Sequence, residues 1–155
     1  MTISRLSESP ERIGSMIGYL DSSVILNNLL SQNPSSKIPL EEFEVTFSST
    51  LLQVEAFRNI DRLRLQNQIE DREVASLVQI LQKMLMKIGE IPVTESVLEW
   101  ASKPFPTVIG TLDAIHVASA LLWKQKEGQD IVFLTHDVQQ GLAARALGLT
   151  TLGID

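Results

Sequence analysis

Four carboxylate side chains stand at helix starts or strand ends in the element order expected for this chain. Asp21 follows the apolar stretch MIGYL, Asp113 opens a helix, Asp137 follows the strand IVFLT, and Glu55 lies in the first turns of another helix. Each has a structural explanation when taken singly, because the free amides and the dipole of a helix N-terminus favour an acidic side chain. Glu55 also has the spacing for an ion pair with Arg58 on its own helix.

Taken together, the four acids indicate a cation site. Carboxylates gathered at one edge of a sheet would repel one another unless a cation neutralised them. Mg²⁺ and Mn²⁺ prefer oxygen ligands and keep several waters, which leaves room for the phosphate oxygens of a substrate. The chain has no cysteine and only two histidines, so nothing in it favours zinc. The pattern predicts a Mg²⁺ or Mn²⁺ site suited to phosphodiester hydrolysis.

The elements that must position these acids alternate between strand and helix. Strands are expected over 16–20, 41–49, 90–94, 131–135 and 150–154, and helices over 22–32, 50–66, 72–89, 95–101, 111–128 and 136–148. This alternation predicts an α/β fold in which a central, mostly parallel sheet is flanked by helices on both faces. Ligands bind at the carboxyl ends of the strands in such folds, so the four acids are expected at one edge.

Local signals set the expected ends of several helices. The spacing of Thr50 and Gln53 predicts a capping box, and Thr111 is expected to cap the helix that carries Asp113. Glycines are expected to end three helices, at Gly89, Gly128 and Gly148.

Composition limits the classes of protein that fit the chain. With 155 residues, of which 44% are hydrophobic, it is long enough for one globular domain over 16–155, preceded by an extension over 1–15. The lack of cysteine excludes disulfides and favours the cytoplasm, and no apolar run approaches the length of a membrane span. A net charge of −6 and an aromatic content of 5% argue against indiscriminate binding of nucleic acid.

Four segments of the chain resemble the signature segments of PIN domains, in the same order. They are MIGYLDSSVIL, LLQVEAFR, TLDAIHVASAL and FLTHDVQQGLAARALGL, and they are particularly similar to those of the VapC-type toxin nucleases of VapBC systems. The resemblance covers nearly all of the chain after residue 15, and the last two segments are the most specific. It implies a PIN-like three-layer sandwich and a single nuclease domain.

The resemblance also implies roles for individual residues. In this family the acids bind Mg²⁺ or Mn²⁺ and activate a water that cleaves RNA. Carried over, the catalytic set is Asp21, Glu55, Asp113 and Asp137, with Asp21, Asp113 and Asp137 as metal ligands and Ser23 and Thr135 as supporting hydroxyls. The implied partners are RNA, an antitoxin protein and a second copy of the chain in a homodimer, and no membrane is expected.

Other residues have two interpretations each. Arg58 and Arg62 share a helical face with Glu55, where they either contact phosphates or form ordinary surface ion pairs. His116 is expected to brace packing or to hydrogen-bond locally rather than to bind metal. The helix over 72–89 either covers the core or forms a face for a partner or a second copy.

Two alternatives to a toxin nuclease remain open. One is a catalytically inactive PIN-like module that binds RNA or protein. The other is a receiver-like phospho-acceptor domain, which also carries aspartates at strand ends. It is disfavoured because YLDSS offers one acid where an acidic pair is expected, and because TTLGID lacks a lysine.

Overall fold

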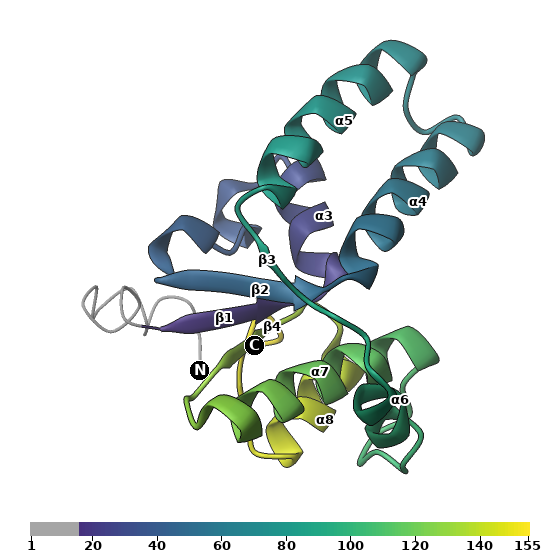
Figure 1. The fold of residues 1–155 in the computed structure, drawn as a ribbon. Helices are drawn as coiled ribbons and strands as arrows, with labels where there is room; N and C mark the ends of the chain where they lie inside the picture. The colour runs from purple at the N-terminus through teal and green to yellow at the C-terminus, as the bar shows by residue number, and fades with distance from the viewer. Residues whose placement is uncertain (1–15) are drawn as a thin grey trace.

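The computed structural model describes residues 16–155, so the extension expected over 1–15 lies outside the described residues. These residues form a five-stranded parallel sheet of order β3-β2-β1-β4-β5 between two layers of helices (Figure 1). The strands are β1 (Ile17–Leu20), β2 (Val45–Ser49), β3 (Gly89–Ile91), β4 (Val132–Leu134) and β5 (Thr150–Leu152). The predicted PIN-like α/β sandwich is confirmed.

Helices cover both faces of the sheet (Figure 1). On one side lie α3 (Ser22–Leu30), α4 (Leu51–Leu65) and α5 (Asp71–Leu85), and on the other lie α6 (Glu95–Ala101), α7 (Thr111–Glu127) and α8 (Val138–Ala146). Two short 3₁₀ helices, η1 (Pro34–Ser36) and η2 (Leu40–Glu42), connect α3 to β2. The strand order also differs from the 2-1-3-4-5 order of receiver-like domains, which weakens that alternative.

Both faces of the central strands are buried, as the apolar runs in the sequence require. In β1, Leu20 packs into the core beneath α3, α4 and α5, while its neighbour Tyr19 packs into the core beneath α7 and α8. Tyr19 stacks on Phe133 of β4, with ring centroids 5.5 Å apart and planes 9° apart. Successive strand residues point to opposite faces, so β1 and β4 anchor both helical layers.

Several predicted helix ends are wrong in detail. Thr50 has helical backbone angles and makes no capping bond, and the Ser49 hydroxyl accepts the Leu51 amide instead. Helix α7 begins at Thr111 with Gly110 at the N-cap, so the hydroxyl of Thr111 does not cap it. Helix α5 ends at Leu85, and the glycine expected to stop it, at position 89, begins β3. Neighbouring short side chains give nearly the same N-cap signal, so the predicted start of a helix can be one residue early or late.

Helix α5 covers the core with one side and exposes the other. Its buried Leu81 belongs to the core beneath α3 and α4, and Val74 and Leu77 pack against that core. Ile80 and, just after the helix, Met86 remain exposed. The interpretation of this helix as a cover for the core therefore accounts for its apolar stripe, and the two exposed side chains are left for other contacts.

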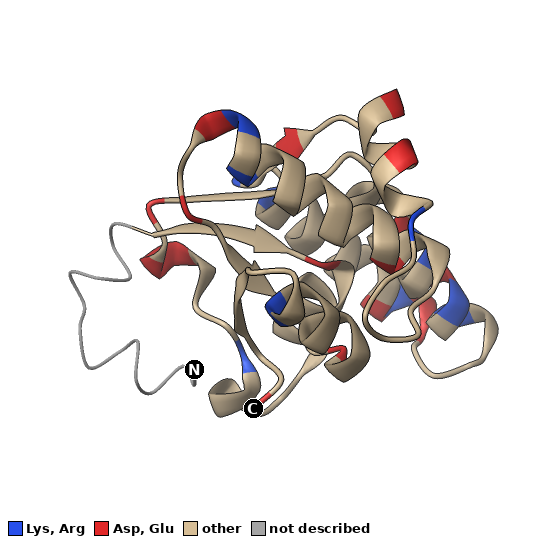
Figure 2. Cartoon of the chain, turned by 90° about the horizontal axis from the view of Figure 1, so that it is seen from below, with Lys and Arg blue, Asp and Glu red and all other residues tan. Residues whose placement is uncertain are grey.

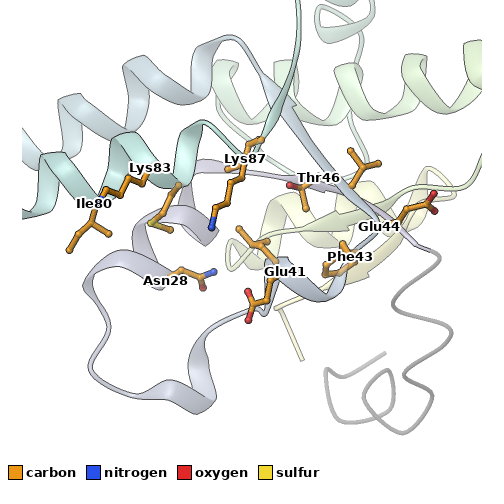
Figure 3. A pocket seen from close by; sticks show the side chains of 12 residues that line it. Asn28, Glu41, Phe43, Glu44, Thr46, Ile80, Lys83 and Lys87 are labelled. Carbon is orange, nitrogen blue, oxygen red and sulfur yellow. The ribbon is translucent and has the colours of Figure 1, made fainter.

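A hollow of about 390 Å³ lies at the opposite end of the sheet from the acidic edge (Figure 3). It opens at the start of β2, beside Glu44 and Thr46. Lys83 of α5 and Lys87, just after that helix, lie on one side, and Glu41 of η2 lies on the other. Lysines and glutamates on facing walls give it no strong charge of one sign. It does not contain the predicted site residues.

Gly153 is the glycine whose replacement we expect to damage the fold most. Its φ is +106°, and a Cβ there would clash with the carbonyl oxygen of Thr135 at the end of β4. Gly153→Ala should therefore lower the free energy of unfolding by about 3 kcal/mol, measured by urea denaturation. Gly128→Ala is the control, because it has φ +65° and open space around it, and it should cost about 1 kcal/mol. Equal losses in the two variants would contradict the importance of the close contact.

No helix of the described residues has the length and apolar character needed to cross a membrane.

Candidate metal centre

The candidate site forms where β1 and β4 end side by side. The chain leaves β1 toward β2 on one side of the sheet and leaves β4 toward β5 on the other, so the strand order reverses between them. A crevice outside the strand ends is expected at such a point. The amide of Asp21 still donates to the carbonyl of Leu134, which holds the residue after β1 against the end of β4.

Asp21 combines a structural role with an unused oxygen. It caps α3, where its Oδ2 accepts the amide of Ser23 at 3.1 Å, and the Thr135 hydroxyl lies 3.5 Å from the same oxygen. The other oxygen, Oδ1, is buried and has no hydrogen-bond partner among the described residues. A buried carboxylate oxygen without a partner is costly in isolation and is well placed to bind a cation.

Glu55 and His116 lie beside this oxygen. One oxygen of each carboxylate and Nε2 of His116 all fall within 4.8 Å of one another. Glu55 Oε1 is 2.6 Å from His116 Nε2, while its Oε2 accepts the hydroxyl of Ser22 at 3.1 Å. Glu55 thus bonds across the fold to α7 and α3, and the ion pair expected with Arg58 is not formed.

Asp113 lies on the first turn of α7 and is electrostatically coupled to the group. Burial, and then the negative charges of Asp21 and Asp137, raise the pKa of Asp113 to about 6, against a smaller opposing effect of His116. Glu55 adds to the same repulsion. Repulsion from the neighbouring carboxylates thus adds to burial in disfavouring the ionised form of Asp113 without a cation.

The hydroxyls of Ser23 and Thr135 connect the ends of β1 and β4. Ser23 Oγ lies 3.4 Å from Thr135 Oγ1 and accepts the amide of His136. Thr135 Oγ1 accepts the Asp137 amide at 3.0 Å and donates to Gln140 Oε1 at 2.7 Å. The two hydroxyls thus connect the loop that leads to Asp137 with the first turn of α3, which Asp21 caps.

Asp137 caps α8 through Oδ1, which accepts the Gln140 amide at 2.9 Å. It lies outside the group of ligand atoms within 4.8 Å of one another, as does Asp113. Gln140, which the sequence did not single out, is completely buried and donates from its side chain to the Asp113 carbonyl. One buried amide therefore connects the two helices that carry these acids.

Arg58 and Arg62 lie on α4, outside the acidic group. Arg58 is 73% exposed and forms an ion pair with Asp61, and Arg62 donates to the Asn59 side chain. Figure 2 shows basic and acidic residues interspersed along the ribbon. The surface ion pairs of α4 fit the simpler of the two interpretations, and contact with phosphate stays a prediction.

His116 packs in the core, as the sequence predicts, but its hydrogen bonds are not local. It is completely buried, and its Nδ1 lies 2.8 Å from the hydroxyl of Tyr19, a residue 97 positions away. Burial alone would lower the pKa of His116, but the bond to Glu55 and the nearby Asp21 charge outweigh it and raise the pKa. The only sequence signal for this contact was the spacing of three from Asp113, which places both residues on one helical face.

The residues present fit a hard divalent cation. The site offers carboxylate oxygens from several elements and one buried oxygen without a partner, and its negative charge adds to burial in raising the pKa of Asp113. Mg²⁺ and Mn²⁺ bind through this kind of donor set.

The comparisons with known proteins support the fold. A solved structure, "Crystal structure of VapBC2 from Rickettsia felis bound to a DNA fragment from their promoter", superimposes with a TM-score of 0.62. The match covers 88% of this chain and 97% of that chain at 12% sequence identity. The chain has a PIN-like fold. No protein-family model matches the PIN-like chain, and no curated protein matches its sequence.

Proposed function

We propose that this PIN-like chain is a Mg²⁺- or Mn²⁺-dependent endoribonuclease, the toxin of a toxin–antitoxin pair. The observation that carries the proposal is the buried, unpartnered Oδ1 of Asp21, which lies beside Glu55 at the carboxyl edge of the sheet. The raised pKa of Asp113 supports it, because a cation would relieve the repulsion that raises this pKa.

The acidic residues have different roles in this proposal. Asp21, Asp113 and Asp137 hold the metal ion, and Glu55 joins them as the fourth acid of the catalytic set. Bound Mg²⁺ or Mn²⁺ supplies Lewis-acid chemistry, by lowering the pKa of a water and neutralising charge on the phosphate. A carboxylate of the set accepts the proton of the attacking water, and Ser23 and Thr135 keep the strand ends in register.

The partners follow from the same proposal. The similar structure is a complex of VapBC2 with promoter DNA, which fits an antitoxin as the partner of this chain. RNA is the substrate, and the chain acts in the cytoplasm as a homodimer. Arg58 and Arg62, which lie close to Glu55 on α4, would contact the phosphates of the RNA as it binds at the site.

A cleavage assay tests the activity. The purified chain, incubated with labelled RNA and with DNA of the same sequence, should cleave RNA with Mn²⁺ or Mg²⁺ and should not after addition of EDTA. Cleavage that persists in EDTA would contradict the metal dependence, and equal cleavage of DNA would contradict the choice of RNA.

The toxin role is tested in cells. Induction of the chain alone should arrest growth, and Asp113→Asn should abolish the arrest at the same protein level. Growth arrest by both forms would contradict a toxic nuclease and favour the alternative of an inactive PIN-like binding module. Calorimetric titration without any Mn²⁺ or Mg²⁺ binding would favour the same alternative.

A further inference from the structure

A chain of three side chains crosses the core behind the acidic edge. Tyr19 of β1, His116 of α7 and Glu55 of α4 are joined by hydrogen bonds of 2.8 Å and 2.6 Å. Tyr19 and His116 are completely buried, and Glu55 is partly exposed at the mouth of the site. The three residues come from three elements far apart in the sequence, so only the folded chain assembles them.

The bonding partners determine where the protons lie. An ionised carboxylate only accepts hydrogen bonds, so Nε2 of His116 must carry the hydrogen that it shares with Glu55. When the imidazole is neutral, Nδ1 accepts from the Tyr19 hydroxyl, and when it is charged, Nδ1 donates to the same oxygen. In both states Nε2 has no lone pair left for a metal ion.

The position of His116 relative to Asp21 agrees with this assignment. Nε2 is 3.6 Å from Asp21 Oδ1, a full ångström longer than its distance to Glu55. The imidazole of His116 is therefore hydrogen-bonded to Glu55 and not to Asp21, and the unpartnered oxygen of Asp21 stays free to bind a cation.

Resting on the proposed function, we infer that Glu55 is a further ligand of the metal beside the three aspartates, that His116 is a positioning residue that fixes the Glu55 carboxylate toward the metal, and that Tyr19 holds the His116 ring in place. His116 is near enough to both carboxylates to resemble a ligand, yet it acts through Glu55 alone. Groups that orient a ligating carboxylate change metal affinity about 10–100-fold when they are removed, although they never touch the ion.

A double-mutant cycle on Mn²⁺ affinity tests this role without any measurement of activity. Calorimetric titration of the whole protein would compare the unsubstituted form, His116→Leu, Glu55→Gln and the double variant. His116→Leu should weaken Mn²⁺ binding about tenfold. In the Glu55→Gln background the same change should have almost no further effect, because the residue through which it acts is gone. Losses that multiply in the double variant would overturn the inference and make His116 an independent ligand.

Two further variants separate positioning from a general loss of folding. His116→Gln keeps a donor in the Nε2 position and should restore most of the affinity lost in His116→Leu. Tyr19→Phe keeps the ring that stacks on Phe133 and removes only the hydroxyl, so it should lower Mn²⁺ affinity a few-fold with little change in melting temperature. No loss in Tyr19→Phe would contradict the holding role of Tyr19.

Pulsed electron paramagnetic resonance of the Mn²⁺-loaded protein gives an answer even where a variant fails to fold. A directly bound imidazole produces nitrogen modulation of the Mn²⁺ signal, and we expect none. Modulation that persists in His136→Gln, which lacks the other histidine of the chain, would identify His116 as a ligand and refute the inference. A complete lack of Mn²⁺ binding by the unsubstituted protein would instead refute the proposed metal-dependent function, and this role with it.

Discussion

Replacing Asp21 by asparagine is expected to lower Mn²⁺-dependent RNA cleavage at least about a hundredfold while the protein stays folded. Asparagine caps helices as well as aspartate does, so the bond to the Ser23 amide at the start of α3 is kept. What is lost is the negative charge at Oδ1, the buried oxygen that has no protein partner. A cation held partly by that charge should bind much more weakly.

Matched variants make this result specific. Asp130→Asn removes one negative charge from a side chain that is 96% exposed and paired with Lys124, and it should leave cleavage unchanged. In EDTA the circular dichroism of Asp21→Asn should match that of the unsubstituted protein, and its melting temperature should be no lower, because the loss of this charge also relieves repulsion on Asp113. Cleavage by Asp21→Asn within threefold of the unsubstituted rate would show that Oδ1 does not hold the metal.

Asp113→Asn should have opposite effects on stability without and with metal. Burial, with repulsion from Asp21 and Asp137, raises the pKa of Asp113 to about 6, whereas in an unfolded chain it lies near 3.9. The folded state thus keeps a proton that the unfolded state loses first. The contribution of protonated Asp113 to the free energy of unfolding is full below about pH 4 and is lost as the pH rises through 6.

The variant should therefore be more stable than the unsubstituted protein at neutral pH in EDTA. Asparagine cannot ionise, so the repulsion disappears, and allowing for solvent screening the gain is about 1–2 kcal/mol, or several degrees in melting temperature. The difference should vanish near pH 4. With saturating Mn²⁺ the order should reverse, because only the unsubstituted protein gains the full stabilisation of the bound ion.

Differential scanning fluorimetry at pH 4 and pH 7.5, in EDTA and in Mn²⁺, measures all four conditions. Asp130→Asn again serves as the control and should show no crossing. If Asp113→Asn were less stable than the unsubstituted protein in EDTA at pH 7.5, burial and carboxylate repulsion together would not penalise the ionised form of Asp113 in the fold.

The architecture could be predicted from the sequence because its signals are local and strong. Strand β4 is a short apolar run buried on both faces. Helix α7 carries small residues on both of its packed sides: Ala120 packs against the sheet, and Ala118 packs toward α6. Alternating strands and helices then admit few topologies. The ends of α4 and α7 were misjudged, since neighbouring positions such as Ser49 and Thr50 give nearly the same capping signal.

The acids themselves were also predictable, as a set at one edge of the sheet. Asp21 follows β1 directly, Asp137 follows β4 after Thr135 and His136, and the carboxyl ends of parallel strands meet at that edge. What could not be predicted was the partner of each carboxylate. Arg58 has the spacing to pair with Glu55, but its guanidinium is bonded to Asp61 and Glu55 turns inward.

The sequence by itself determined which residue types lie near the strand ends, because alternation, caps and apolar runs are properties of neighbouring residues. Only the tertiary structure decided which atoms meet. His116 lies 61 positions from Glu55 and 97 from Tyr19, and nothing within one helix or strand specifies those contacts. They arise because α4 and α7 approach β1 from opposite faces of the sheet, and burial then requires each polar atom to find a partner. Oδ1 of Asp21 is the buried atom of this group that the fold leaves unpaired.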